Sequence, residues 1–258
     1  MKVVILCGGR GTRISEETEV LPKPMVMIGN KPILWHIMKS FSRYGHNDFI
    51  LCLGYRGYVI KEYFSHYFLH MSDATIDMAN NKVKIHNSAS EPWKVTLVDT
   101  GLDTMTGGRL KKVEKFVGKG TFLMTYGDGL ADVDINKLVK THKNNKKLAT
   151  LTAVQNTGRF GVLDIDKDNA IKNFLEKPKN ESAWINGGFF VLQPEVFKYI
   201  NEGSSTVWER GPLENLASDN ELSAYKHHGF WKCMDTLRDK VELEGLWDSG
   251  KAKWKTWK

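Results

Sequence analysis

The sequence is poor in cysteine and has no long apolar segment. Its 258 residues include three cysteines, Cys7, Cys52 and Cys233, an odd number without the spacing of a zinc site. We therefore expect reduced thiols, as in a cytoplasmic protein, and no disulfide framework. No apolar run approaches the roughly 18 residues that cross a bilayer, and only five apolar residues, 3–7, precede the first glycine. These absences predict neither a signal peptide nor a membrane anchor.

Internal repeats, low-complexity tracts and long linkers are absent too. A chain of this length buries roughly three quarters of its unfolded surface, so one core is large enough to fold it. We expect one domain over residues 1–258, with one half from 1 to 130 and a second half from 131 to 258 that ends in a helix. The net charge of +7 suits acidic ligands, whether nucleotides, sugar phosphates, nucleic acid or anionic lipid.

The most informative stretch is residues 3–25. An apolar run at 3–7 predicts a buried strand, and Gly8-Gly9-Arg10-Gly11-Thr12-Arg13 follows it directly. Glycines let backbone amides approach an anion, and an arginine fork suits phosphate. Lys23 lies between Pro22 and Pro24, whose fixed φ angles stiffen the segment that carries its ammonium group. The stretch predicts a phosphate-binding turn followed by a preorganised lysine.

Strand and helix patterns then alternate. A strand at 48–53 lies between helical patterns that open at Pro32 and Tyr58, and further strands are expected at 95–98, 122–126 and 148–154. This order predicts an α/β fold with a parallel sheet and right-handed crossovers. Residues 69–93 break the rhythm, because two alternating segments flank Asn80-Asn81, a pair that tolerates a tight turn. We interpret this insertion as a β-hairpin for subunit contacts.

Two further turns lie where ligands bind in open α/β sheets. Thr104 and Arg109 bracket a glycine turn that opens a helix, and free amides there favour a phosphate or a carbonyl-rich base. Asp128 lies between glycines at the end of an expected strand. Each feature also has a plainer interpretation, helix capping for the first and a turn aspartate for the second.

Three other features allow both a functional and a structural interpretation. Asp132-Val133-Asp134 has the D-x-D form of metal-dependent glycosyltransferases, but aspartates just before a helix are usually caps. Asn186-Gly187-Gly188 marks either close approach of a ligand or a bulge. The tail at 251–258 interleaves lysines with tryptophans. We expect its indoles to dock on the protein or on a neighbouring subunit, in preference to nucleic acid or a membrane.

The glycine motif matches neither the dinucleotide-binding nor the P-loop pattern. It resembles the G-G-x-G-T-R signature of the sugar-1-phosphate nucleotidyltransferases, which is followed at the same distance by Pro22-Lys23-Pro24-Met25. Later motifs in the family's order extend the resemblance over essentially the whole chain: Tyr126-Gly127-Asp128-Gly129, Glu176-Lys177-Pro178, Asn186-Gly187-Gly188 and Met234-Asp235. The resemblance implies an α/β fold with a Rossmann-like mixed, mainly parallel sheet flanked by helices and with inserted β-hairpins, the nucleotide-diphospho-sugar transferase fold. It also implies magnesium dependence and a homo-oligomer.

Within this family the chain is most similar to the cytidylyltransferases that act on glucose 1-phosphate. The similarity lies in 91–93, 95–101, 105–109 and 253–257. Uridylyl- and thymidylyltransferases place a Gln-Pro-x-Gly segment against the base, and neither Gln155 nor Gln193 begins one. The resemblance thus implies CTP and glucose 1-phosphate as substrates, CDP-glucose for bacterial surface polysaccharide (O-antigen) synthesis as product, and a hexamer. Uridylyl or thymidylyl transfer, a GT-A glycosyltransferase and a regulatory sensor are the alternatives.

The resemblance also implies residue roles. Arg13, Lys23 and Asp128 would be catalytic, and Asp128 and Asp235 would share one Mg²⁺ ion. The nucleotide would contact Leu6, Cys7, Gly8, Gly9, Arg10, Gly11, Thr12, Arg13, Lys23, Thr104, Arg109 and Asp128. The sugar phosphate would contact Tyr126, Gly161, Glu176, Lys177, Asn186 and Gly187. No histidine is assigned, because a sugar phosphate is largely dianionic at neutral pH and needs no protein base.

Overall fold

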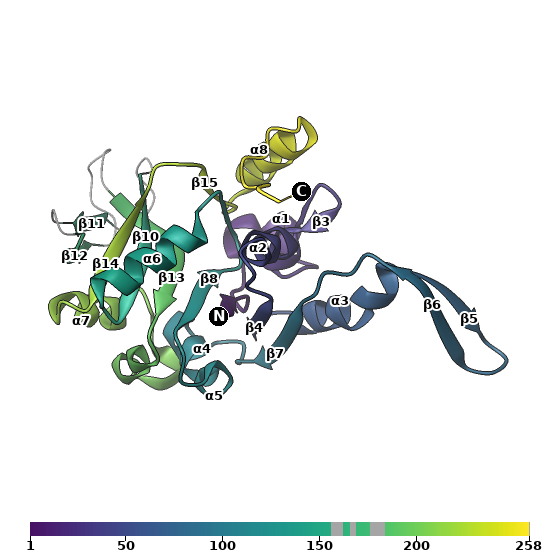
Figure 1. The fold of residues 1–258 in the computed structure, drawn as a ribbon, viewed down its shortest axis with the longest axis horizontal. Helices are drawn as coiled ribbons and strands as arrows, with labels where there is room; N and C mark the ends of the chain where they lie inside the picture. The colour runs from purple at the N-terminus through teal and green to yellow at the C-terminus, as the bar shows by residue number, and fades with distance from the viewer. Residues whose placement is uncertain (156–161, 166–168, 176–183, 258) are drawn as a thin grey trace.

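The computed structural model describes residues 1–155, 162–165, 169–175 and 184–257, with backbone alone for residues 13, 15, 16, 162–165 and 172–175. Nine of the described strands form one sheet: β1 Lys2–Leu6, β4 Asp48–Leu53, β7 Lys94–Asp99, β8 Phe122–Tyr126, β10 Ala149–Gln155, β11 Val162–Ile165, β12 Ile171–Leu175, β13 Trp184–Leu192 and β14 Leu222–His227. Seven follow the order β12-β11-β13-β8-β1-β4-β7, and β10 joins β13 to β14. Figure 1 shows this sheet at the centre of the molecule.

The central strands of this sheet are parallel. β1 pairs in parallel with β4 and β8, and β4 pairs in parallel with β7. β13 runs antiparallel to β8 and to β10, while β14 is again parallel to β10. The predicted mixed, mainly parallel α/β sheet is confirmed. Parallel pairing places the ends of β1 and β8 at the same edge, where the two glycine turns of the sequence begin.

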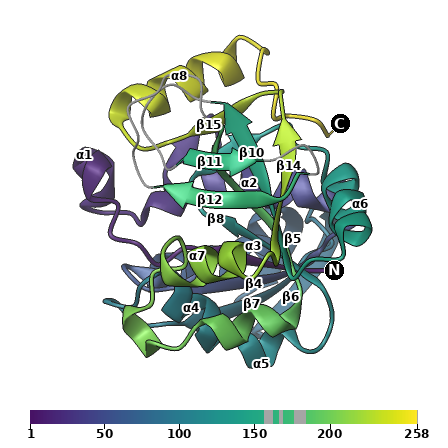
Figure 2. The same ribbon diagram turned by 90° about the vertical axis from the view of Figure 1, so that its left-hand side faces the viewer.

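Helices cover both faces of the sheet (Figure 2). The α-helices are α1 Ser15–Thr18, α2 Ile33–Ser42, α3 Gly57–His70, α4 Thr106–Lys112, α5 Glu114–Val117, α6 Ile135–Asn145, α7 Gly211–Ser218 and α8 Leu237–Asp248. The 3₁₀ turns are η1 Thr12–Ile14, η2 Lys23–Met25, η3 Pro194–Tyr199 and η4 Gly203–Ser205. Among the described residues, none of the helices combines the length and apolar character needed to cross a membrane.

The core has two parts because alternate residues of a strand face opposite sides of a sheet. Val3 and Ile5 of β1 pack in one apolar cluster with α2, α6 and α8. Val4 and Leu6 of the same strand pack in a second cluster with α4, α5 and α7. β1 is buried on both faces, as its unbroken apolar run predicts, and so holds the glycine turn that follows it in a fixed place.

Three small two-stranded sheets complete the described structure: β2 Met27–Ile28 with β3 Lys31–Pro32, β5 Ser72–Asp77 with β6 Lys82–Ser88, and β9 Gly129–Ala131 with β15 Trp231–Cys233. The β5–β6 pair confirms the predicted hairpin, and Asn81 at its turn has φ of 51°. We call residues 72–88 the hairpin arm, since Figure 1 shows them projecting away from the body beyond α3.

Candidate active site

A cleft of about 360 Å³ opens at the carboxyl ends of β1 and β8. Its walls come from the glycine turn after β1, the segment around Lys23, the start of α4 and the end of β8. The lining residues are Leu6, Cys7, Gly8, Gly9, Gly11, Thr12, Lys23, Pro24, Thr104, Met105, Thr106, Arg109, Tyr126, Gly127 and Asp128. The fold therefore brings together most of the residues that the sequence motifs select, at the edge where parallel sheets bind ligands.

Arg109 holds the glycine turn in place through hydrogen bonds to backbone carbonyl oxygens. Arg109 is 4% exposed, and its guanidinium group donates hydrogen bonds to Gly8 O at 2.9 Å, to Leu53 O at 3.1 Å and to Gly101 O at 2.7 Å. A Cβ on Gly8 would lie 2.1 Å from Arg109 Nη1, so only glycine allows this approach. Arg109 thus lines the cleft, while its N–H donors hold the turn, β4 and the loop before α4 together.

Lys23 lies at the floor of the cleft between two carboxylates. Its Nζ is 2.7 Å from Asp128 Oδ2 and 2.6 Å from Asp235 Oδ1. The two aspartates meet because Asp128 directly precedes β9, Asp235 closely follows β15, and these two strands pair with Gly129 opposite Cys233. Pro22 precedes Lys23 in an extended conformation, with ψ of 145°, and the lysine side chain leaves a 3₁₀ turn that is buried. The sequence predicted a stiffly held lysine, and the structure supplies its partners.

The electrostatics of this cluster follow from its burial and its charges. Burial by itself would lower the pKa of Lys23, but Asp128, Cys233 and Asp235 outweigh burial and raise that pKa above its ordinary value. Lys23 is therefore a cation at every physiological pH. With a side chain that is 5% exposed, Asp235 is almost fully removed from water, so the ammonium group compensates a buried negative charge.

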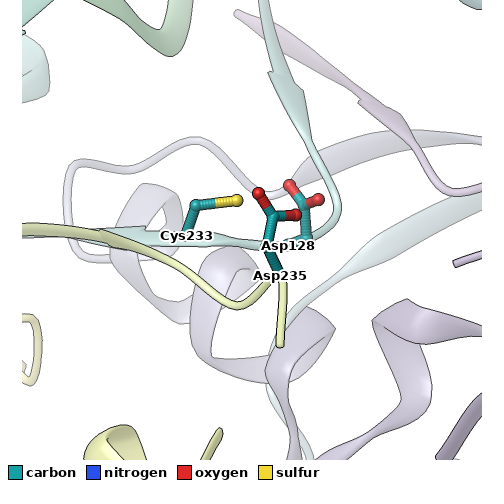
Figure 3. A group of neighbouring side chains, drawn as sticks. All are labelled: Asp128, Cys233 and Asp235. Carbon is teal, nitrogen blue, oxygen red and sulfur yellow. The ribbon is translucent and has the colours of Figure 1, made fainter. Parts of the chain in front are cut away.

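Cys233 is a third possible ligand that no motif marks. Figure 3 shows its sulfur directed toward the carboxylates of Asp128 and Asp235, and the ligand atoms of the three residues lie within 4.8 Å of one another. Burial raises the pKa of the Cys233 thiol well above its ordinary value, and Asp128 raises it further. The protonated thiol is a poor ligand for a hard cation, whereas the two carboxylates suit one.

A family model described as nucleotidyl transferase matches residues 2–232 of the chain. The chain belongs to the nucleotidyl transferase family. Its similarity to known members extends over its whole length. A glucose-1-phosphate cytidylyltransferase of Salmonella typhimurium is 60% identical over 258 residues, which cover 100% of both chains. A probable glucose-1-phosphate cytidylyltransferase of Bacillus subtilis is 46% identical over 257 residues, again covering 100% of both chains.

Solved structures share the fold of this chain. HddC from Yersinia pseudotuberculosis, in complex with GMP-PN, superposes with a TM-score of 0.75 at 22% identity, covering 95% of this chain and 99% of HddC. A UDP-glucose pyrophosphorylase in complex with UDP-glucose gives the same TM-score of 0.75 at 16% identity, covering 96% and 98%. At these identities the likeness concerns the fold, which is the nucleotide-diphospho-sugar transferase fold that the motifs imply.

The nucleotidyltransferase cleft extends toward residues expected to bind the sugar phosphate. Tyr126 lies at the end of β8, and Asn186 and Gly187 lie on β13 nearby. A Cβ on Gly188, which has φ of 80°, would lie 2.7 Å from the Tyr126 ring, so glycine lets the ring pack against the strand. Gly187 O accepts a hydrogen bond from Trp231 Nε1 at 2.7 Å. β13 continues through the glycines, but its register against β10 shifts between the pairs Leu151–Phe190 and Ala153–Asn186, in agreement with the bulge interpretation.

The remaining predicted residues divide into three groups. Arg10 lies at the rim, where it forms an exposed 2.8 Å ion pair with Asp103. Thr104 lies in the wall and is 6% exposed, and its hydroxyl accepts a 3.1 Å hydrogen bond from Lys112 Nζ. Outside the described residues lie Gly161, Glu176 and Lys177, as well as the side chain of Arg13.

The plainer interpretation holds for two other features of this nucleotidyltransferase. Asp134 caps α6 by accepting a hydrogen bond from Lys137 N at 3.0 Å, and Asp132 lies 3.0 Å from His227 Nε2, so the D-x-D segment serves the local fold. The tail docks on the protein. Trp254 is fully buried and stacks on Trp247, while the neighbouring lysines are exposed.

Two residues that contact or adjoin the cleft residues were not predicted from the sequence. Glu209 lies in the segment before α7 and hydrogen-bonds the hydroxyls of Tyr126 and Thr106. Cys233 lies on β15, two residues before Asp235. Neither belongs to a recognisable motif, because each reaches the cleft only through strand pairing or packing between distant segments. No pattern within the sequence identifies such residues.

Proposed function

We propose that this nucleotidyltransferase transfers a cytidylyl group from CTP to glucose 1-phosphate, forming CDP-glucose and pyrophosphate. The observation that carries the proposal is the position of Lys23, fixed between Asp128 and Asp235 at the floor of a cleft lined by the glycine turn. Such an arrangement suits a polyphosphate. The choice of cytosine and glucose rests on the relative of 60% identity and full-length coverage.

The reaction is an in-line displacement in which the sugar phosphate provides the nucleophile. A phosphate oxygen of glucose 1-phosphate bonds to the α-phosphorus of CTP, and the bond from that phosphorus to the bridging oxygen of the β-phosphate breaks. Pyrophosphate carries away the electron pair. The dianionic phosphate needs no protein base, so the chain's contribution is positioning and neutralisation of charge. The absence of any histidine among the residues that line the described cleft agrees with this mechanism.

The nucleotide side of the cleft is assigned to the first half of the chain, residues 1–130. Backbone amides of the turn from Gly8 to Gly11 hold the triphosphate, and Thr12 with Arg13 holds the β- and γ-phosphates that leave. Lys23 neutralises the α-phosphate or the sugar phosphate. Thr104 lines the base pocket, and Arg109 fixes the shape of that pocket through the glycine turn.

Asp128 and Asp235 fit a magnesium ion. Their oxygens converge, both are carboxylates, and magnesium prefers few carboxylates together with water and phosphate oxygens. When bound, the ion would neutralise charge that develops on the phosphates. The protonated Cys233 thiol does not fit this ion and is not assigned to it.

The sugar phosphate is assigned to the second half, residues 131–258, together with Tyr126. Tyr126, Asn186 and Gly187 form the described part of this pocket. Gly161, Glu176 and Lys177 are proposed to complete it, with Lys177 on the phosphate and Glu176 on sugar hydroxyls. One domain over the whole chain would thus contain both halves of the site.

The protein is further proposed to act as a cytoplasmic homo-oligomer, a hexamer by resemblance to the family. The hairpin arm supports the proposal of subunit contacts. Ile76 and Val83 lie opposite each other in its strands and are 52% and 58% exposed, and Met78 is 80% exposed. An isolated hairpin gains little by exposing such side chains to water. CDP-glucose would serve bacterial surface polysaccharide (O-antigen) synthesis.

The test is to incubate the protein with glucose 1-phosphate, Mg²⁺ and one nucleoside triphosphate at a time, and to measure pyrophosphate. We expect CTP to give the highest kcat/KM. A preference for UTP or dTTP would instead identify the uridylyl or thymidylyl alternative. Failure of every triphosphate to release pyrophosphate would overturn the proposal. Release of a nucleoside diphosphate from a nucleotide sugar would then identify a glycosyltransferase.

A further inference from the structure

Glu209 links the two sides of the cleft through both of its carboxylate oxygens. Oε1 accepts a short hydrogen bond from the Tyr126 hydroxyl, and Oε2 accepts one from the Thr106 hydroxyl at 2.6 Å. Tyr126 is the last residue of β8 and lies two residues before Asp128, and Thr106 is the first residue of α4. One side chain therefore joins the proposed sugar side of the site to the wall beside the proposed base pocket.

The segment that carries Glu209 is anchored on α4. Trp208, the preceding residue, is fully buried, and its backbone N–H donates to Thr106 Oγ1 at 2.9 Å. Cβ atoms on Gly107 and Gly108 would lie 2.8 Å from Thr206 and Ser204, so the two glycines let α4 contact this segment directly. The backbone at Glu209 is thus held on both sides, and its carboxylate has little freedom to move.

β13 places Asn186 and Gly188 beside Tyr126. Gly188 N donates to Asn186 Oδ1 at 2.8 Å, so the backbone holds this amide oxygen. The Tyr126 phenol has a single hydrogen. That single proton is donated to Glu209.

The direction of these bonds limits what Tyr126 can do for a ligand. A phenol has one donor hydrogen and two acceptor lone pairs. With its hydrogen on Glu209, the oxygen can act toward a ligand only as an acceptor. A sugar hydroxyl that donates a proton matches this position, whereas a phosphate dianion, which has no proton to donate, does not.

We propose that Glu209 is a positioning residue for the sugar, because it fixes the Tyr126 oxygen as an acceptor for one hydroxyl of the hexose 1-phosphate. This inference rests on the proposed function and goes beyond it, since it assigns Tyr126 to the sugar ring and not to the phosphate. Glu209 itself does not contact the substrate. It acts through Tyr126, and its second hydrogen bond, to Thr106, fixes the position of Tyr126 relative to α4.

The test compares Glu209→Gln with the wild-type protein in the pyrophosphate assay. Glutamine has the same shape but only one acceptor oxygen, so it cannot accept from both hydroxyls, and its amide N–H groups face one of them. We expect KM for glucose 1-phosphate to rise about tenfold, as for loss of a hydrogen bond to a charged group, and KM for CTP to change less than about threefold. Glu214→Gln, an exposed glutamate on α7, is the matched control.

Two further measurements separate positioning from a general structural role. Tyr126→Phe in the Glu209→Gln background should add little to the change in KM, because both substitutions remove the same interaction. Among the monodeoxy analogues of glucose 1-phosphate, one should show the same KM with wild-type protein and with Glu209→Gln. That analogue lacks the hydroxyl that Tyr126 accepts.

The outcomes are distinct. A lower melting temperature for Glu209→Gln with unchanged KM for glucose 1-phosphate would overturn the inference while the proposed function stands. Equal sensitivity of every deoxy analogue to Glu209→Gln would overturn it as well. If wild-type protein releases no pyrophosphate with any nucleoside triphosphate, the proposed function fails before the variant is assayed.

Discussion

The cleft and the hairpin arm are built in opposite ways. At the cleft, Lys23 is 8% exposed and its partners, Asp128 and Asp235, lie 105 and 212 residues away in the sequence. In the arm, each strand pairs only with the other within residues 72–88, and its apolar side chains face water. The geometry of the cleft therefore requires contacts between distant parts of the chain, whereas the strands of the arm require only each other.

Substitutions in the two regions should therefore have different effects. A substitution at the cleft leaves a buried charge without its partner, so it affects both chemistry and stability. A substitution in the arm removes no buried contact within the monomer, so it acts only through whatever binds the arm. Matched substitutions in the two regions therefore measure how far the chemistry is confined to the cleft.

The largest effect is expected for Asp128→Asn. The substitution removes a proposed magnesium ligand and one partner of Lys23, so kcat should fall by more than about a thousandfold in the pyrophosphate assay. Asp73→Asn, in the arm, is the control and should keep wild-type turnover. Near wild-type activity of Asp128→Asn would reject the metal role of this carboxylate.

The second-largest effect is expected for Lys23→Ala. Its kcat/KM should be lower by about a hundredfold to a thousandfold, which is the scale of losing a key electrostatic donor. Steady-state kinetics with varied CTP and glucose 1-phosphate measure it, with Lys84→Ala in the arm as the control. A change confined to KM would show that Lys23 binds substrate equally in the ground state and the transition state.

A pH-dependent loss of stability is expected from His36 of α2. Burial lowers the pKa of His36 to about 4 from its ordinary value of 6.5, although Nε2 hydrogen-bonds Ile28 O at 3.0 Å. The folded protein thus keeps this histidine neutral where the unfolded chain binds a proton. The stabilisation is complete above pH 6.5 and is lost as the pH falls toward 4.

Urea unfolding at pH 7 and at pH 5 measures this loss, which should be on the order of 2 kcal/mol over that interval. His36→Gln should reduce the dependence by about this amount and leave the part that comes from His46 and His142, whose pKa burial also lowers to about 4. His86→Gln, exposed in the arm, should leave the dependence unchanged. The assignment to His36 is wrong if both variants keep the wild-type slope.

The smallest effect on the monomer is expected for the pair Ile76→Ser and Val83→Ser. Both side chains are more than half exposed, so the free energy of unfolding of the monomer should change by less than about 0.5 kcal/mol. Sedimentation should show a smaller assembly than for the wild-type protein, with Lys84→Ala unchanged. An unchanged assembly would remove the arm from the proposed subunit contacts.

Much of the local structure follows from short-range patterns. The strand at 48–53 and the strand at 122–126 have the bounds that their apolar runs predict. Asp134 caps α6 and the arm turns at Asn81, because capping and turn preferences act within a few residues. The local sequence left two interpretations open for the glycines at 187 and 188. They lie within β13, where Gly188 makes room for the Tyr126 ring from another strand.

The candidate site was predictable as a set of motifs but not as a geometry. The sequence alone determined the strand, the glycine turn and the stiffened Lys23, because backbone freedom and proline restriction are properties of adjacent residues. Only the tertiary structure placed Lys23 between Asp128 and Asp235, braced the turn with Arg109 and brought Glu209 to Tyr126. Those contacts arise from the pairing of strands and the packing of segments far apart in the chain, which no local pattern encodes.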